Sequence, residues 1–162
     1  MSDKKVSRWM KKNVVSISEE ATLKDAASLL AEKRVGTLPV VDETGKMVGL
    51  ISMRGLVSFF LPDFIRLVED VDFVQDYGAL ADLSEEDIER ANSMKVKEIM
   101  DEPMQIKEDC SLVRALSMMS THDTPDLTVV RDDKPVGIVS RVDIGRGFFE
   151  SWLQGNRKVK GA

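Results

Sequence analysis

The sequence predicts an α+β fold built from two similar β-α-β-β-α motifs, related by a pseudo-twofold axis and separated by a helical insert. The first observation is a repeated phrase, GLISMRGL at residues 49–56 and GIVSRVDI at residues 137–144. The second is that the sequence around each phrase also repeats in the same order. A single copy would leave one face of its sheet uncovered, so the two copies are expected to fold face to face.

Each copy is expected to open with a short helix and an extended stretch. The helices are VSRWM at 6–10 and VKEIM at 96–100, and the extended stretches are NVVSI at 13–17 and PMQI at 103–106. The match between the copies is therefore much longer than one motif. It indicates a duplicated unit of about fifty residues.

A longer amphipathic helix follows in each copy, at 21–33 and at 110–122. Apolar residues recur in both segments at the spacing of one helix face. Thr22 and Ser111 precede these helices at equivalent places, where a hydroxyl can accept a hydrogen bond from a free amide of the first turn. Both are expected to be N-caps, and Asp25 completes a variant capping box in the first copy.

Two strands and a last helix complete each copy. The strands are expected at 38–41 and 49–52 in the first copy and at 127–130 and 137–140 in the second, separated by the turns DETGK and RDDKP. Helices then leave from Ser52 and Ser140, whose hydroxyls are placed to cap them.

Residues 61–95 are repeated in neither copy and form an insert. The segment 63–89 holds ten acidic residues and one basic residue, with apolar residues at helix-like intervals. One or two amphipathic helices are expected, broken near Tyr77-Gly78, and Ser84 is expected to cap the second helix through Asp87. The acidic face is either a solvated surface, a dimer contact or a docking surface for a basic partner.

The chain is therefore expected to contain four segments. Residues 1–60 form the first motif with its N-terminal helix, 61–95 the acidic amphipathic helical insert, 96–150 the second motif and 151–162 a C-terminal tail.

The composition excludes several classes of function. No apolar run approaches the roughly 20 residues of a membrane-spanning helix, so no membrane span is expected. The formal charge of −5 argues against general nucleic-acid binding, because phosphate backbones are held mainly by clustered lysine and arginine. Cys110 is the only cysteine and no secretion signal is recognised, so the expected location is cytoplasmic.

Catalytic and metal-binding motifs are not recognised either. His122 and Cys110 belong to no cluster with metal-ligand spacing, so no metal is predicted. They lie at opposite ends of one predicted helix, which is too far for a nucleophile and its base. No motif combines a base, a nucleophile and an oxyanion donor, and the chain is not expected to be an enzyme.

The repeats resemble a tandem pair of CBS domains, named after cystathionine beta-synthase and called a Bateman module. The residues that carry the resemblance are the paired V-x-x-h-M openings, the strands LPVVD and LTVVR, and above all the paired G-h-h-S-x-x-D/G stretches. The resemblance covers residues 6–60 and 96–150. It implies a cleft between the motifs that binds a regulatory adenosine-containing ligand, such as AMP, ADP, ATP or S-adenosylmethionine.

The resemblance implies that Asp143, the acid that ends the second motif, holds both ribose hydroxyls. A carboxylate suits this role because its two oxygens can accept hydrogen bonds from neighbouring hydroxyls, each worth about 1.5–3 kcal/mol. Ser140 starts the same helix and is placed for a phosphate or the ribose edge, and Arg141 could screen phosphate charge. Taken alone, Asp143 could instead be an exposed first-turn acid that stabilises a helix dipole.

By position, the resemblance assigns the adenine contacts to Met104, Gln105 and Ile106, with Ser16 among their counterparts in the first copy. Family members that bind phosphorylated nucleotides often carry basic residues just before the second strand. This chain has Asp126 there, which would repel a phosphate that approached it.

The first copy departs from the second at the ribose-binding position, because it has Gly55 where the second has Asp143. A glycine has no side chain to hold a sugar. Any ligand of the first site is therefore expected to be held by Ser52, Arg54 and the backbone.

The leading hypothesis is a non-catalytic sensor that binds an adenosine ligand and signals in trans to an effector protein, which the sequence does not identify. CBS pairs commonly dimerise, so a homodimer is expected, with the aromatic residues at 59–60 and 148–149 as candidate contacts. The alternative is a structural adaptor or dimerisation module with a vestigial ligand site, acting through the acidic helical insert.

Overall fold

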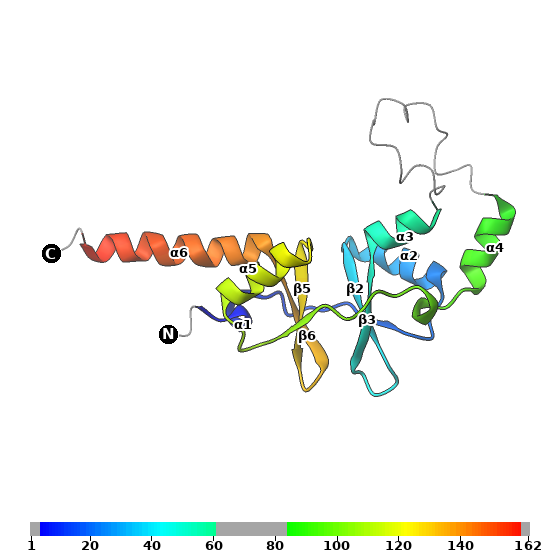
Figure 1. Cartoon of the computed structure of the whole chain (residues 1–162), viewed down its shortest axis with the longest axis horizontal. Coiled ribbons are helices and arrows are strands. Elements are labelled where there is room, and N and C mark those ends of the chain that lie inside the picture. Colours follow the sequence, from blue (N-terminus) through cyan, green and yellow to red (C-terminus); the bar gives the residue numbers. More distant parts are fainter. Residues whose placement is uncertain (1–3, 61–83, 160–162) are drawn as a thin grey trace, which may run out of the picture. The chain divides into compact units, whose positions relative to one another are not determined.

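The computed structural model describes residues 4–60 and 84–159 and has the predicted α+β class, with two three-stranded sheets (Figure 1). The chain divides into two compact units. One comprises Met1–Ser16, Val41–Met47 and Pro103–Ala162, and the other comprises Ile17–Val40 and Val48–Glu102. We call them the Asp143 unit and the Gly55 unit after the seventh residue of the repeated phrase that each contains.

The elements of the first copy follow the predicted order. They are α1 (Val6–Trp9), β1 (Ile17–Ser18), α2 (Leu23–Lys33), β2 (Thr37–Val41), β3 (Met47–Ser52) and α3 (Met53–Phe60). The stretch predicted to be extended at 13–17 is a strand only at its end. Just before this stretch, the backbones of Lys11 and Ile138 exchange two hydrogen bonds, with N–O distances of 2.8 and 2.9 Å. Lys11 is therefore held by a strand of the second copy.

The insert and the second copy supply the remaining elements. They are α4 (Glu85–Ser93), the 3₁₀ helix η5 (Val96–Glu98), β4 (Gln105–Lys107), α5 (Leu112–Thr121), β5 (Asp126–Arg131), β6 (Lys134–Ser140) and α6 (Arg141–Val159). The short helix predicted at 96–100 is thus a 3₁₀ helix, and α6 runs through most of the segment predicted to be a tail. The Ser84 hydroxyl accepts from the amide of Asp87, which confirms the predicted cap of α4. The first helix predicted in the insert and its break lie outside the described residues.

The two sheets have the strand orders β1-β2-β3 and β4-β5-β6. In the second sheet β4 runs parallel to β5, and β5 runs antiparallel to β6 with Asp126 opposite Ser140. The turn between β5 and β6 consists of Asp132 and Asp133, which have φ values of 50° and 63°. Two consecutive residues at positive φ match the right-handed twist of a hairpin, and aspartate tolerates this conformation better than most residues. No helix within the described ranges is both long and apolar enough to cross a membrane.

The core of the Asp143 unit combines the second copy with the N-terminal helix. Val6 of α1 is fully buried among the apolar side chains of β4, α5, β5, β6 and α6. The amide of Val6 donates to the carbonyl of Cys110 at 2.9 Å, and that of Ser7 donates to the carbonyl of Glu108 at 3.2 Å. The helix that opens the first copy in sequence therefore packs against the second copy.

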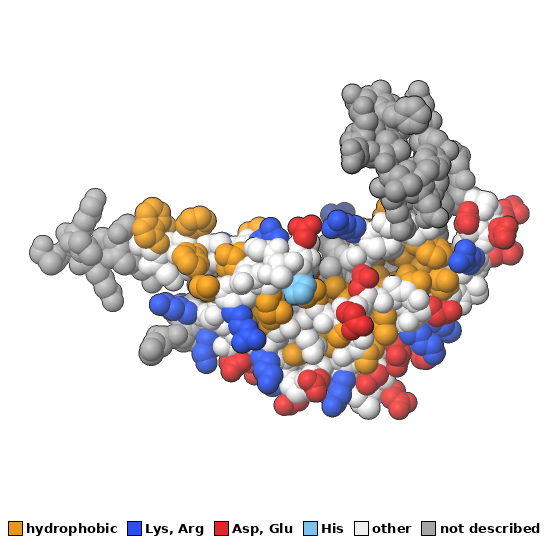
Figure 2. All heavy atoms as spheres, viewed as in Figure 1, with side chains coloured by type: hydrophobic (Ala, Val, Ile, Leu, Met, Phe, Trp, Pro, Cys, Tyr) orange, Lys and Arg blue, Asp and Glu red, His pale blue; other side chains and the backbone are white. Residues whose placement is uncertain are grey.

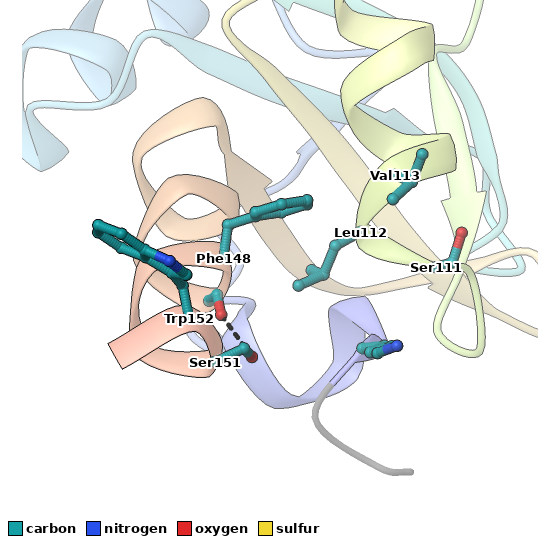
Figure 3. A pocket seen from close by; sticks show the side chains of 8 residues that line it. Ser111, Leu112, Val113, Phe148, Ser151 and Trp152 are labelled. Atoms are coloured by element: carbon teal, nitrogen blue, oxygen red, sulfur yellow. Dashed lines mark hydrogen bonds between the residues drawn. The ribbon is translucent and has the colours of Figure 1, made fainter. Parts of the chain in front are cut away.

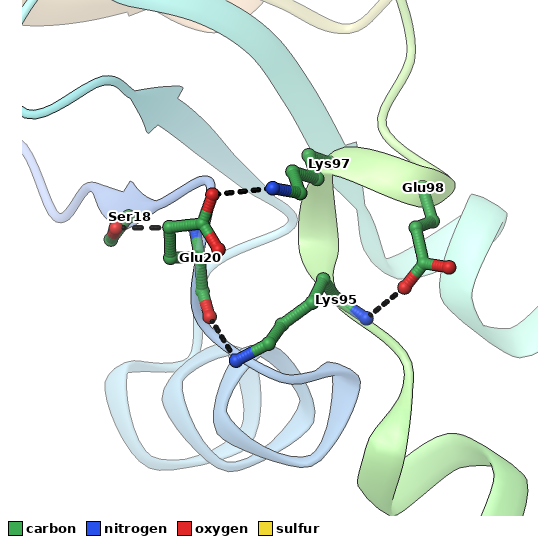
Figure 4. A network of polar contacts seen from close by, with 5 residues as sticks. All are labelled: Ser18, Glu20, Lys95, Lys97 and Glu98. Atoms are coloured by element: carbon green, nitrogen blue, oxygen red, sulfur yellow. Dashed lines mark hydrogen bonds and ion pairs between the residues drawn. The ribbon is translucent and has the colours of Figure 1, made fainter.

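In the Gly55 unit, the opening helix of the second copy packs in the same way against the first copy. Val96 of η5 is fully buried, and its amide donates to the carbonyl of Ala21 at 2.8 Å. Polar contacts fix the same segment from outside: Lys97 Nζ binds the Glu20 carboxylate and Lys95 Nζ donates to the Glu20 carbonyl at 2.8 Å (Figure 4). The hydrogen bond from Lys97 lowers the pKa of Glu20. Each opening helix therefore packs against the motif that it does not precede.

A glycine in the last strand of each copy lets the residues that follow the opening helix of the other copy approach this strand closely. A Cβ added at Gly49 would lie 2.8 Å from Met100 Cγ and 3.0 Å from the carbonyl oxygen of Asp101. A Cβ added at Gly137 would lie 2.9 Å from Met10 Cγ. The glycines of the repeated phrase thus serve packing inside each unit.

The predicted caps of the long helices are present, and the one at α2 gives a stability prediction. Thr22 Oγ1 accepts from the amide of Asp25 at 3.2 Å, and Asp25 Oδ2 accepts from the amide of Thr22 at 2.9 Å. Replacing Thr22 by alanine is expected to lower the free energy of unfolding by about 1 kcal/mol, measured by urea denaturation at neutral pH. Ser28→Ala, in the exposed middle of the same helix, is the control and should cause no loss. Equal losses in the two variants would contradict the cap.

The same box should weaken in acid. The hydrogen bonds from Thr22 lower the pKa of Asp25 below its ordinary value. A carboxylate with a lowered pKa stabilises the folded state above the unfolded pKa, and this contribution is lost as the pH falls through the folded pKa. The difference between wild type and Thr22→Ala should therefore shrink at acidic pH.

Candidate functional site

The candidate site of the Asp143 unit lies where β6 ends and α6 begins. The Ser140 hydroxyl accepts from the amide of Asp143 at 3.2 Å, which confirms Ser140 as the N-cap. Asp143 Oδ2 in turn accepts from the amide of Ser140 at 2.9 Å and from its hydroxyl at 2.7 Å. The two residues therefore form a capping box that fixes the orientation of the carboxylate.

The remaining oxygen of Asp143 gives the site its chemistry. The residue is buried, with 8% of its surface exposed, so it is not an exposed first-turn acid. Its Oδ2 is engaged with Ser140, whereas no hydrogen bond to Oδ1 is made by the described part of the chain. A carboxylate held in this way can accept a hydrogen bond at Oδ1 without losing its position, and a charged acceptor makes that bond strong.

Arg141 is directed toward the end of α5. Its Nη2 donates to the carbonyl of Met119 at 3.0 Å and its Nε to the carbonyl of Thr124 at 3.3 Å. A cation that binds the last carbonyls of a helix also interacts favourably with the helix dipole. Arg141 thus stabilises the end of α5, and its predicted interaction with a phosphate stays a prediction.

The strand register brings part of the predicted adenine contact to the same edge of the sheet. Ser140 pairs with Asp126, and Gln105 pairs with Thr128 on the neighbouring strand. Met104, which precedes Gln105, therefore lies near the edge where Ser140 ends its strand, and its carbonyl accepts from the amide of Thr128 at 3.4 Å. Ile106 is buried in the core and can offer only its backbone to a ligand.

Gln105 points to a different place. Its side chain lines a hollow of about 500 Å³ together with Cys110, Arg114 and Met118, and Ser140 and Asp143 are not among the residues that line it. Gln105 Oε1 is buried without a hydrogen-bond partner in the described part of the chain. Burial raises the pKa of the Cys110 thiol, which keeps it in the neutral form.

In the Gly55 unit, Ser52 repeats the cap without the acid. The Ser52 hydroxyl accepts from the amide of Gly55 at 3.0 Å, which confirms Ser52 as the N-cap of α3. Arg54 follows in the exposed first turn. Ser16, exposed just before β1, is grouped with the Asp143 unit. The predicted residues of the first copy are therefore divided between the two units.

Two equivalent residues that the sequence did not single out pair with the strands that end at the caps. Asp101 pairs with Leu50 and Lys11 pairs with Ile138, both as isolated antiparallel bridges. Both residues follow the methionine that ends the opening V-x-x-h-M. An alignment of the two copies could have pointed to these residues, because the side chains at the two equivalent positions have opposite charges.

An apolar surface on α6 is separate from the caps. Phe148, Phe149, Trp152 and Leu153 are each more than half exposed and contribute to the apolar groups along this helix in Figure 2. Phe148 lies toward Leu112 in a hollow of about 450 Å³ that Trp152 also lines, and Ser151 there donates to the carbonyl of Gly147 in its own helix (Figure 3). These aromatic residues are thus on the surface rather than in the core.

Comparison with known proteins identifies the pattern of the repeats. The family described as CBS domain matches residues 6–62 and 96–148. The uncharacterized protein MJ1404 of Methanocaldococcus jannaschii is 27% identical over 145 residues, which cover 89% of this chain and 32% of that protein. The uncharacterized protein YlbB of Bacillus subtilis is 29% identical over 122 residues, 74% of this chain and 66% of YlbB. The chain thus spans about a third of MJ1404 and two thirds of YlbB.

Solved structures show the same fold. CBSX2 from Arabidopsis thaliana has a TM-score of 0.67 and 24% identity, with 95% of this chain and 97% of CBSX2 covered. CBSX2 has also been solved in complex with AMP. The CBS domain pair of MJ0100, in complex with 5′-methylthioadenosine and S-adenosyl-L-methionine, has a TM-score of 0.64 and 25% identity, with 91% and 97% covered. All three of these ligands contain an adenosine group.

Proposed function

Because this chain belongs to the CBS domain family, we propose that it is a non-catalytic regulatory module whose Asp143 unit binds an adenosine-containing ligand of the AMP, ADP, ATP or S-adenosylmethionine class. The observation that carries the proposal is the Asp143 carboxylate, which is buried, oriented by Ser140 and open at Oδ1. The ligands of CBSX2 and MJ0100 support the choice of an adenosine group.

The ribose is the part of the ligand that this site suits. The ribose has two neighbouring hydroxyls, and each can donate a hydrogen bond. Asp143 Oδ1 can accept one of these bonds, and the Ser140 hydroxyl and Asp143 Oδ2 lie beside it. Hydrogen bonds to a charged acceptor are stronger than neutral ones, so the acid favours a ligand that presents hydroxyl donors at this place. Arg141 remains available at Nη1 for a phosphate or a carboxylate of the ligand.

Regulation requires that the ligand bind two conformations of the protein with different affinity. We propose that ligand binding favours one of these conformations and that a separate effector protein recognises it. A homodimer is part of the proposal, because a second copy would double the surfaces that such an effector could read. The effector is defined only by this role.

The proposal predicts that an adenosine compound raises the melting temperature of the whole chain. A panel of AMP, ADP, ATP and S-adenosylmethionine should include at least one compound that stabilises, by about 2.7 kcal/mol at a hundredfold excess over its dissociation constant. The matched control is the 2′-deoxy form of the nucleotide that stabilises most, which lacks one ribose hydroxyl and should stabilise less. A melting temperature unchanged by every compound at millimolar concentration would contradict the proposal.

The exposed apolar side chains of α6 favour a second candidate function, an adaptor or dimerisation module with a vestigial ligand site. Phe149 and Trp152 are the most exposed aromatic residues of this surface. This alternative predicts a dimer in sedimentation velocity that Phe149→Ser weakens, together with no response to the adenosine compounds. A dimer that also binds an adenosine compound would support the first function instead.

A further inference from the structure

The first copy lacks the acid of the repeated phrase, but its unit contains another acid close to that position. A Cβ added at Gly55 would lie 3.1 Å from Ser52 Oγ and 3.8 Å from Asp101 Oδ2. The Asp101 carboxylate therefore reaches the space beside the helix cap that the side chain of an aspartate at position 55 would enter. Asp101 comes from the segment after η5, not from the repeated phrase.

Hydrogen bonds hold the backbone of Asp101 in place, and this limits the positions that its carboxylate can occupy. The amide of Asp101 donates to the carbonyl of Leu50 at 2.9 Å, and the amide of Leu50 donates to the carbonyl of Asp101 at 3.0 Å. Met100, the preceding residue, packs against Gly49. A side chain on such an anchored backbone loses less freedom on binding than one on a loose chain.

The Asp101 carboxylate is also chemically available. The residue is exposed, and the described part of the chain makes no hydrogen bond or ion pair to either of its oxygens. Asp143, by contrast, uses Oδ2 for the capping box. Asp101 can therefore offer two acceptor oxygens to a pair of hydroxyls.

The other unit shows the same positions with the charges exchanged. Lys11 pairs with Ile138 as Asp101 pairs with Leu50, so Lys11 is the counterpart of Asp101. One unit thus combines Asp143 with Lys11, and the other combines Gly55 with Asp101. The residue after the opening methionine is therefore basic in the unit that keeps the acid of the repeated phrase and acidic in the unit that lacks it.

We propose that Asp101 replaces the acid missing at position 55, so that the Gly55 unit forms a second adenosine site whose ribose hydroxyls bind a carboxylate from the opening segment of the second copy. This inference rests on the proposed function of the Asp143 unit, and it adds a site that the repeated phrase alone would count as lost. Ser52 caps the adjacent helix and takes the place that Ser140 has in the other unit.

Calorimetric titration of the whole chain tests the proposal, with AMP and S-adenosylmethionine as separate probes. The wild type is expected to bind two molecules of at least one probe. Asp101→Asn should weaken one of the two sites about tenfold or more, and Asp143→Asn should weaken the other. Glu102→Gln is the matched control, because it removes a neighbouring exposed charge and should leave both sites unchanged.

The outcomes separate this inference from the proposed function. One site that Asp143→Asn removes and Asp101→Asn leaves unchanged would overturn the inference while the proposed function stands. Two sites that are both insensitive to Asp101→Asn would overturn it as well. No binding of either probe would overturn both proposals.

A charge exchange provides a second test that does not depend on the loss of a side chain. Asp101→Lys should abolish the second site, and adding Gly55→Asp should restore it, because the double variant gives this unit the residue pattern of the other. Gly55→Asp alone should bind more weakly than the double variant, since its carboxylate would face Asp101. Failure of the double variant to bind better than Asp101→Lys, with circular dichroism showing both folded, would count against the proposal.

Discussion

Replacing Asp143 by alanine is expected to remove the ligand stabilisation of the Asp143 unit, about 2.7 kcal/mol at a hundredfold excess of ligand over the dissociation constant of that site. The physical reason is that Asp143 Oδ1 is the charged acceptor of the site, and alanine leaves the ribose hydroxyls without it. The measurement is urea denaturation with and without the adenosine compound that stabilises the wild type most.

Asp143 also supports the start of α6, so the experiment needs a variant with the same structural loss. Asp25→Ala provides it, because Asp25 closes the capping box of α2 with Thr22 as Asp143 does with Ser140. Both variants should be somewhat less stable without ligand, by up to about 1 kcal/mol. Only Asp143→Ala should lose ligand stabilisation, and a full ligand response in this variant would exclude Asp143 from the site.

The second large effect is expected from Gly49→Ala, which should lower the free energy of unfolding by about 1–3 kcal/mol. The added methyl group would lie 3.0 Å from the carbonyl oxygen of Asp101 and 2.8 Å from Met100 Cγ. The methionine can change its rotamer, but the carbonyl is held by the amide of Leu50. Relief of the clash therefore requires the paired backbone segments to separate.

Gly145→Ala is the control for this variant, and its effect should have the opposite sign. Gly145 lies within α6, where an added Cβ meets no atom within 4 Å. Alanine is favoured over glycine in a helix by about 1 kcal/mol, so the control should be more stable than the wild type. Chemical denaturation of both variants measures the difference, and a neutral Gly49→Ala would show that the segment after η5 is not packed against β3.

The local features of the fold followed from the sequence because short-range chemistry determines them. Hydroxyl residues before an amphipathic run become caps, and Thr22, Ser84 and Ser140 all do so. The long helices and the paired strands were predicted from periodicity, which reports directly on which face is buried. The resemblance of the repeated phrase singled out Ser140 and Asp143, and the structure adds that the two residues form one capping box.

The sequence predicted less well where a segment has a partner far away in the chain. The stretch 13–17 was expected to be extended and contributes only Ile17 to a strand, and the pairing of Lys11 with Ile138 just before this stretch was not foreseen. Arg141 was expected to screen the charge of a phosphate, which stays a prediction, whereas its hydrogen bonds to the carbonyls of Met119 and Thr124 were not foreseen. A side chain with several donors takes whichever acceptors the packed chain presents, and a linear pattern does not contain that information.

The sequence by itself determined the duplication, the identity of each cap and the loss of the acid at Gly55. Only the tertiary structure decided that each opening helix packs against the other copy and that Asp101 reaches the space beside Gly55. The reason is physical: hydrogen bonds within a turn depend on neighbours in the chain, whereas burial of Val6 or Val96 depends on which apolar surface the folded chain leaves open to it.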